Sequence, residues 1–173
     1  MQYLTTTFAL AAAVAAIDIQ GHIESHCGGG NRVTFTNVSP DRCYATGGIS
    51  WAYSFRAIPT DWRLSTRSHG GGGCGFIFHV FDSNGRDLVC HGGDVNNVEY
   101  TGAGYSFINR KRSEDVAVAS QDCIKPDLLE IEGGPTYNLL GLEDETYKTM
   151  LDYAWNGTTA PDMPSAFDEY IVQ

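Results

Sequence analysis

The sequence has little positive charge. Eleven Lys and Arg residues stand against 21 Asp and Glu residues, so the formal net charge is -10 and the isoelectric point is near 4.7. Binding to nucleic acid depends on Lys and Arg side chains that neutralise phosphates. We therefore expect no nucleic-acid partner for the intact chain.

The sequence also lacks a long hydrophobic run. A membrane-spanning helix needs about 20 apolar residues. Phe8–Ala16 is shorter, lies at the extreme N-terminus and ends in small residues, which is typical of a secretory signal peptide. We interpret residues 1–16 as this signal peptide. The sequence thus predicts a secreted, extracellular protein that does not associate with membranes.

No CxxC pair is present among the five cysteines, so zinc-ribbon and redox-motif interpretations have no support. Export to an oxidising compartment favours disulfides instead. Four cysteines precede residue 113, and their order favours the bridges Cys27–Cys43 and Cys74–Cys90, although three pairings are possible. Cys123 either bonds one of these four or stays free.

Common hydrolase motifs are absent as well: neither GxSxG nor HExxH occurs. The alternative enzyme hypothesis is a small secreted ribonuclease that uses His79 or His91, because such a site needs an acid and a base on either side of a phosphate. His79 alternates with apolar residues, which favours a half-buried structural role. A non-enzymatic protein is the main hypothesis.

The sequence predicts no cofactor and no metal site. His22, His26 and Cys27 are the one group with metal-ligating side chains close together. We interpret this stretch as an exposed N-terminal arm, with Cys27 in a disulfide.

Residues 17–112 have the patterns of β-strands. Several short runs are rich in aromatic and β-branched residues and are separated by Gly-rich turns. Asn84-Gly85 favours a two-residue hairpin turn between two of these runs. The expected strands are Arg32–Val38, Ile49–Ile58, Trp62–Thr66, Phe76–Phe81, Asp87–Cys90 and Val98–Ile108. Short antiparallel strands in this number predict a mainly β protein with a small Greek-key-like β-sandwich as its core.

Residues 113–173 differ in charge and in pattern. They contain two Lys/Arg and thirteen Asp/Glu, a net of -11, whereas residues 17–112 contain nine and eight, a net of +1. Leu128–Ile131 and Tyr137–Leu140 predict a small hairpin around a Gly-Gly-Pro turn. Glu143–Trp155 has acids in its first turn and apolar residues at helical spacing, which predicts a helix. Ser165–Tyr170 is expected to form a further helical turn.

The basic triplet Arg110-Lys111-Arg112 stands at the boundary between these two regions. Kexin-type proteases of the fungal secretory pathway cut after Lys-Arg. We interpret Lys111-Arg112 as a maturation site for such a protease, with a disulfide-stapled core at 17–112 and an acidic propeptide or second chain at 113–173. The alternative is an uncut, solvated charge run.

Ser54–Gly75 resembles the opening of a βγ-crystallin Greek-key motif, in which a Ser-x-Arg-hydrophobic sequence precedes a Trp strand and a Gly-containing turn. The matching positions are Ser54, Arg56, Ile58, Trp62 and Gly73. The calcium signature of that family is not evident here. As a whole, the chain resembles the small secreted cysteine-containing proteins of fungi, which include effectors and killer-toxin-like proteins.

The resemblance implies a secreted interaction protein that binds a host, competitor or cell-wall target. Asn156-Gly157-Thr158 is a glycosylation sequon, and glycosylation of Asn156 is expected if it lies on the surface of an exported protein.

Overall fold

The computed structural model describes residues 16–92, 98–108 and 123–172. The signal-peptide segment up to residue 15 and the predicted processing site at Lys111-Arg112 lie outside the described residues. No helix of the described part is long and apolar enough to cross a membrane.

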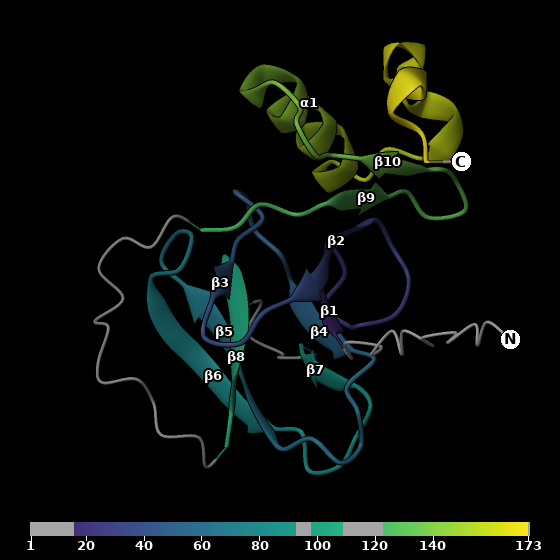
Figure 1. The fold of residues 1–173 in the computed structure, drawn as a ribbon. Helices are drawn as coiled ribbons and strands as arrows, with labels where there is room; N and C mark the ends of the chain where they lie inside the picture. Colours follow the sequence, from purple (N-terminus) through teal and green to yellow (C-terminus); the bar gives the residue numbers. More distant parts are fainter. Residues whose placement is uncertain (1–15, 93–97, 109–122, 173) are drawn as a thin grey trace, which may run out of the picture.

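The described residues form two antiparallel sheets, as the fold-class prediction requires (Figure 1). The larger sheet has the order β10-β9-β2-β1-β4-β7 and the smaller sheet the order β3-β8-β5-β6. The strands are β1 (Ile17–His22), β2 (Arg32–Val38), β3 (Cys43–Tyr44), β4 (Ala52–Arg56), β5 (Leu64–Gly70), β6 (Phe76–Asp82), β7 (Val89–His91), β8 (Gly102–Phe107), β9 (Leu128–Glu130) and β10 (Thr136–Asn138).

Alternate side chains of the two sheets face each other and form the core. Ile19 and Phe55 point inward from the larger sheet, and Leu64 and Tyr105 from the smaller one, all at most 2% exposed. Burial begins with period 2 in β1 and β5, whereas β4 and β8 are buried on both faces over most of their length.

The central strand β1 was not predicted. Ile17 and Ile19 are fully buried, and His22, expected on an exposed arm, is buried at the end of the strand. β1 pairs with β2 on one side and with β4 on the other. The arm interpretation is therefore wrong for His22, because the segment is the middle of a sheet and not a free end.

The predicted disulfide pairing is also wrong. Cys27 bonds Cys90, and Cys43 bonds Cys74, at sequence separations of 63 and 31 residues. Cys27 follows β1, and β4 alone separates β1 from β7, the strand that carries Cys90. Strand order in the sheets, and not order in the sequence, sets which cysteines meet.

The Asn-Gly turn forms, but it does not join a hairpin. Asn84 and Gly85 both have positive φ, 49° and 75°, and Arg86 N donates to Ser83 O at 2.9 Å. The strand before the turn, β6, pairs with β5, and the strand after it, β7, pairs with β4. The turn thus carries the chain from one sheet to the other.

Glycines on β8 let two neighbouring segments come close. A Cβ on Gly104 would lie 2.4 Å from Arg42 O, and a Cβ on Gly102 would lie 2.6 Å from Gly73 O. Both distances are too short for a real side chain. β3 and the 71–75 turn therefore rest directly on the backbone of β8.

The acidic C-terminal part continues the same fold. β9 pairs with β2 through three residue pairs, with Leu129 opposite Val33. Helix α1 (Asp144–Trp155) and the 3-10 turns Ala160–Asp162 and Ser165–Tyr170 follow β10. The buried side chains of α1 belong to the same hydrophobic cluster as the sandwich core: Tyr147, Met150, Leu151 and Ala154.

Replacing Leu129 by Ala should destabilise the whole described fold. The side chain is fully buried between β2 and β10, and truncation of such a Leu costs about 2–5 kcal/mol. Denaturant unfolding should show one transition at a lower midpoint. Leu140→Ala is the control, because Leu140 is 64% exposed. A sandwich transition that is unchanged by Leu129→Ala would contradict a shared core.

Candidate functional site

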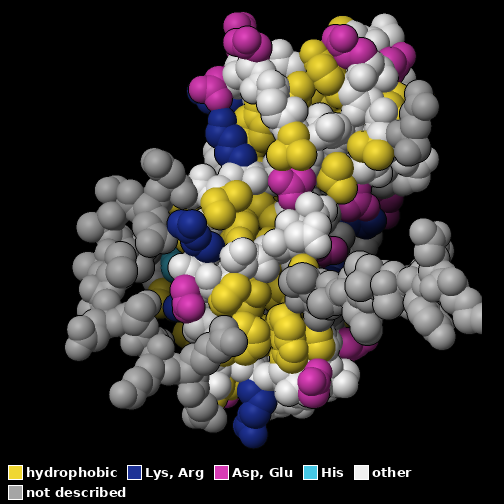
Figure 2. All heavy atoms as spheres, in the orientation of Figure 1, with side chains coloured by type: hydrophobic (Ala, Val, Ile, Leu, Met, Phe, Trp, Pro, Cys, Tyr) yellow, Lys and Arg dark blue, Asp and Glu magenta, His cyan; other side chains and the backbone are white. Residues whose placement is uncertain are grey.

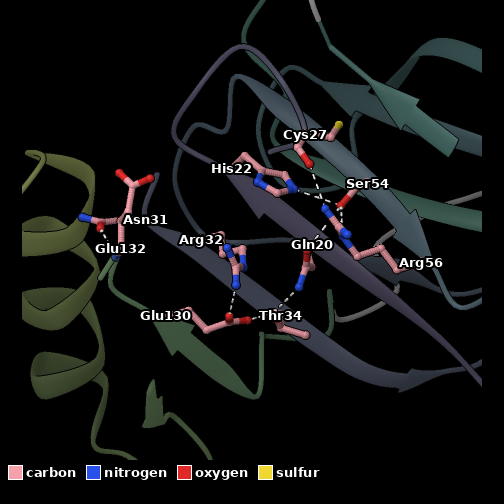
Figure 3. Close-up of polar contacts among 10 residues, drawn as sticks. All are labelled: Gln20, His22, Cys27, Asn31, Arg32, Thr34, Ser54, Arg56, Glu130 and Glu132. Carbon is pink, nitrogen blue, oxygen red and sulfur yellow. Dashed lines mark hydrogen bonds and ion pairs between the residues drawn. The ribbon is translucent and has the colours of Figure 1, made fainter. Parts of the chain in front are cut away.

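Polar side chains form a row on the outer face of the larger sheet (Figure 3). β1 places Gln20 and His22 on the face opposite Ile19, and the register sets Thr34 of β2 and Ser54 of β4 on either side of Gln20. We call this set the polar row; its members are Gln20, His22, Arg32, Thr34, Ser54, Arg56 and Glu130.

The hydrogen bonds of the polar row run in one direction. Gln20 Nε2 donates to Thr34 Oγ1 at 3.2 Å, and Thr34 Oγ1 donates to Glu130 Oε1 at 2.7 Å. Ser54 Oγ donates to Gln20 Oε1 at 3.5 Å, so the hydroxyl proton of Ser54 points toward Gln20. The ring of His22, whose Nε2 lies 2.9 Å from Ser54 Oγ, then donates to that hydroxyl.

The polar row contains two arginines, Arg32 and Arg56. Arg32 forms an ion pair with Glu130, so it links β2 of the sandwich to β9 of the acidic part. Arg56 Nε donates to Ser54 Oγ at 3.1 Å, and its Nη2 donates to Cys27 O at 2.8 Å. The disulfide Cys27–Cys90 fastens the same loop to β7. The loop after β1 is thereby held by both a covalent bond and a charged hydrogen bond.

Asn31 closes this loop against the C-terminal part. Its Nδ2 donates to Ala154 O at 2.9 Å and to Thr158 O at 3.0 Å, and its Oδ1 accepts from Glu132 N at 2.9 Å. The side-chain amide of Asn31 thus connects the loop after β1 to backbone groups at the end of α1 and in the turn after β9. Burial of such groups is tolerated because each is hydrogen-bonded.

His22 is held in its neutral form. Burial, and then the nearby Arg56 and Arg32 guanidinium groups, lower its pKa to about 4. Because the His22 ring donates to Ser54 Oγ, and the Ser54 proton is directed to Gln20, the ring does not act as a base toward this hydroxyl. Both side chains are fully buried, so no substrate reaches them, and the polar row fastens strands together.

The two histidines of the ribonuclease hypothesis do not form an acid–base pair. His91 is fully buried, and its ring nitrogens are used by Thr66 Oγ1 at 2.8 Å and Ser68 Oγ at 3.1 Å. Burial lowers its pKa to about 3. The ring of Phe81 contacts His91 at a centroid distance of 4.6 Å and His79 at 5.8 Å. This geometry gives the hypothesis no support.

The other predicted site residues lie at separate places. Cys123 is a free, half-buried thiol. Asn156 ends α1 with an exposed side chain. The described residues contain no group of three His, Cys, Asp or Glu side chains arranged to hold a metal ion, and the buried His22 is separated from the exposed His26 by its place in β1.

An apolar strand is exposed at the end of the smaller sheet. β6 pairs with β5 on one side and is the last strand of that sheet in the described part of the chain. We call this the β6 surface. Five of its seven side chains are apolar and between 41% and 59% exposed: Phe76, Ile77, Phe78, Val80 and Phe81. β6 lies on the sandwich, away from α1 (Figure 1).

The surface of the C-terminal part is acidic. Figure 2 shows Asp and Glu side chains gathered around the end of the molecule that holds α1. The first turn of α1 contains Asp144 and Glu145, and its last turn contains no basic residue. Lys125 pairs with Asp144 at 2.6 Å.

Comparisons with known proteins agree with a secreted protein. A family model named ARB_05566_N and described as an N-terminal domain matches residues 18–127. A protein of Arthroderma benhamiae, described as an uncharacterized secreted protein, is 22% identical over 171 residues, which cover 95% of this chain and 90% of the relative. No solved structure matches the chain. The prediction of a secreted protein is confirmed.

Acid should destabilise the fold through His22. The pKa of His22 is about 4 in the folded protein and near 6.5 in an unfolded chain, so the unfolded state takes up the proton first as the pH falls. The stabilisation is complete above pH 6.5 and is lost between about pH 6.5 and pH 4, by at most roughly 3 kcal/mol.

His22→Gln should therefore flatten the pH dependence of the free energy of unfolding in this window, measured by urea titration at several pH values. His26→Gln, at an exposed position in the loop after β1, is the control substitution. Equal slopes for parent and His22→Gln would show that His22 does not resist protonation in the fold.

Proposed function

The chain belongs to the ARB_05566_N family, and on this premise we propose that it is a secreted, non-enzymatic interaction protein of the effector or killer-toxin-like class. It acts by binding a protein of a host, a competitor or a cell wall. The β6 surface is the observation that carries this proposal, because it is an exposed edge strand with apolar side chains on both faces.

An exposed apolar edge strand is unusual in a secreted monomer. Natural sheets protect their edges with charges, prolines or covering segments, because a free edge pairs with other chains. Between Phe76 and Phe81 this strand contains no Lys, Arg, Asp, Glu or Pro. Its pairing with β5 has a register shift between Ser68 and His69, but the apolar side chains on both sides of this shift are exposed.

The partner that fits is an extended, uncharged segment of a target protein. Such a segment adds to a sheet edge as a further strand, with backbone hydrogen bonds for affinity and side-chain contacts for specificity. The exposed aromatic rings of Phe76 and Phe78, which contact each other at a centroid distance of 5.7 Å, would cover alternate side chains of the added strand.

The proposal includes maturation by a kexin-type protease after Lys111-Arg112. Support comes from the change in charge at this point of the sequence, from +1 over residues 17–112 to -11 over residues 113–173. The pairing of β9 with β2 and the Arg32–Glu130 ion pair keep the acidic part in place after the cut. Maturation then yields one particle of two chains.

Val80→Lys should weaken the binding of an extended strand. Lysine on an edge strand opposes pairing, and Val80 is 52% exposed. The probe is a fluorescent heptapeptide of alternating Thr and Val, measured by anisotropy. We expect at least a tenfold loss of affinity, about 1.4 kcal/mol. Val172→Lys, at a similarly exposed position beside β10 of the larger sheet, should bind like the parent, and the same peptide with a central Pro should not bind.

Sedimentation velocity of the same variants separates target binding from self-association. A parent that forms dimers, with a Val80→Lys variant that does not, would mean that a second copy of the chain occupies the β6 surface. A parent that neither binds the peptide nor dimerises would contradict the proposed surface.

Mass spectrometry of the secreted protein tests the maturation. Under denaturing, reducing conditions we expect two polypeptides, one ending at Arg112 and one beginning at Ser113, and a single particle in native size-exclusion chromatography. Arg112→Ala should give one uncut chain with the same native elution volume. One uncut chain in the parent would contradict processing.

A further inference from the structure

Three of the five cysteines lie together at one corner of the sandwich. Tyr44 of β3 faces Ile124 in a parallel bridge. Ile124 N donates to Cys43 O at 3.1 Å, and Ala45 N donates to Ile124 O at 3.0 Å. The segment that begins at Cys123 therefore runs alongside β3 in the same direction.

This register places Cys123 beside Cys43. The two segments run parallel, so the residues that precede Tyr44 and Ile124 are also neighbours. Their side chains lie on the same face of the sheet. Neighbouring strands are about 4.8 Å apart, and a disulfide needs a Cα–Cα distance of roughly 4.4–6.8 Å. Neighbours in this register fall within the range that a disulfide needs.

Cys123 also lies beside the turn that carries Cys74. A Cβ built on Gly73 would lie 3.2 Å from Cys123 Sγ, and the next residue is Cys74, which bonds Cys43. Gly73 has a φ of +53°, which a side chain rarely adopts. The glycine thus leaves room for a thiol next to the bridge.

We propose that Cys123 exchanges with the Cys43–Cys74 disulfide. The Cys123 thiolate attacks Cys43 Sγ, the Cys43–Cys74 bond breaks as the Cys43–Cys123 bond forms, and the Cys74 thiolate takes up the proton that Cys123 released. One disulfide and one thiol are present before and after the step, so no oxidant or reductant is consumed. Cys27–Cys90, on the larger sheet, takes no part.

The exchange changes how the two parts of the chain are joined. Cys43 and Cys74 both precede the predicted cut, so their bridge lies within the first part, whereas Cys43–Cys123 crosses it. This consequence rests on the proposed maturation after Arg112. After the cut, exchange would convert an acidic part held by strand pairing into one held by a covalent bond.

The exchange is tested on uncut Arg112→Ala protein, so that it does not depend on maturation. The oxidised, folded protein is incubated at pH 8 without reductant, the thiols are alkylated with iodoacetamide, and the bridges are mapped by peptide mass spectrometry without reduction. We expect a Cys43–Cys123 peptide and label on Cys74. Label on Cys123 alone, with Cys43–Cys74 intact, would overturn the proposal.

Two internal controls make the result specific. Cys27–Cys90 should remain intact, and its loss would mean general scrambling and would also count against a local exchange. Cys123→Ser should give no label at all. A bridge between Cys74 and Cys123 would overturn the choice of Cys43 as the attacked sulfur.

A second variant measures proximity without exchange. Cys74→Ser leaves Cys43 and Cys123 as thiols, which oxidised glutathione should join to each other in folded protein, as judged by far-ultraviolet circular dichroism. Mixed disulfides with glutathione at both positions would show that the two sulfurs do not meet. In the matured parent under denaturing conditions, two chains that separate only after reduction would confirm both the exchange and the cut.

Discussion

The backbone pairing of β2 with β9 is the interaction on which the rest of the structure depends. It joins two regions of different net charge, one near neutral and one strongly acidic, into a single sheet. The hydrophobic cluster then runs without a break from Phe35 of the sandwich to Met150 of α1. Without this pairing, β2 would be an open edge of the larger sheet.

Polar contacts reinforce this pairing on the outer face of the sheet. Thr34 and Arg32 of β2 both contact the Glu130 carboxylate, and Thr36 of the same strand binds Asp127 through its backbone N at 2.6 Å and its hydroxyl at 2.7 Å. The carboxylates that make the C-terminal part acidic are therefore used where they meet β2. Two of these carboxylates, Asp127 and Glu130, thus help to hold the C-terminal part against β2.

Local patterns predicted most of the fold. The strand Arg32–Val38 was predicted at its observed bounds, and the helix Glu143–Trp155 within one residue. In the strand, apolar and polar residues alternate in the sequence, and in the helix the buried side chains follow the helical spacing of the apolar residues. β1 was missed although Ile17 and Ile19 alternate with polar residues, since the strand directly follows the expected signal peptide and ends in Gly21 and His22.

Contacts between distant segments could not be predicted from the sequence. The disulfide partners depend on the strand order β1-β4-β7 and on the close approach of β3 to β8, and neither has a local signal. The polar row likewise needs the register that sets Gln20 opposite both Thr34 and Ser54. Each of its residues is ordinary by itself, and only the sheet brings them into one line.

The uneven distribution of charge along the chain gives the molecule an uneven electric field. The acidic end holds α1, and the β6 surface lies on the near-neutral sandwich (Figures 1 and 2). Fields of this kind orient a protein as it approaches a charged surface. Near the anionic surface of a cell, the acidic end would be repelled, and the near-neutral sandwich would approach first.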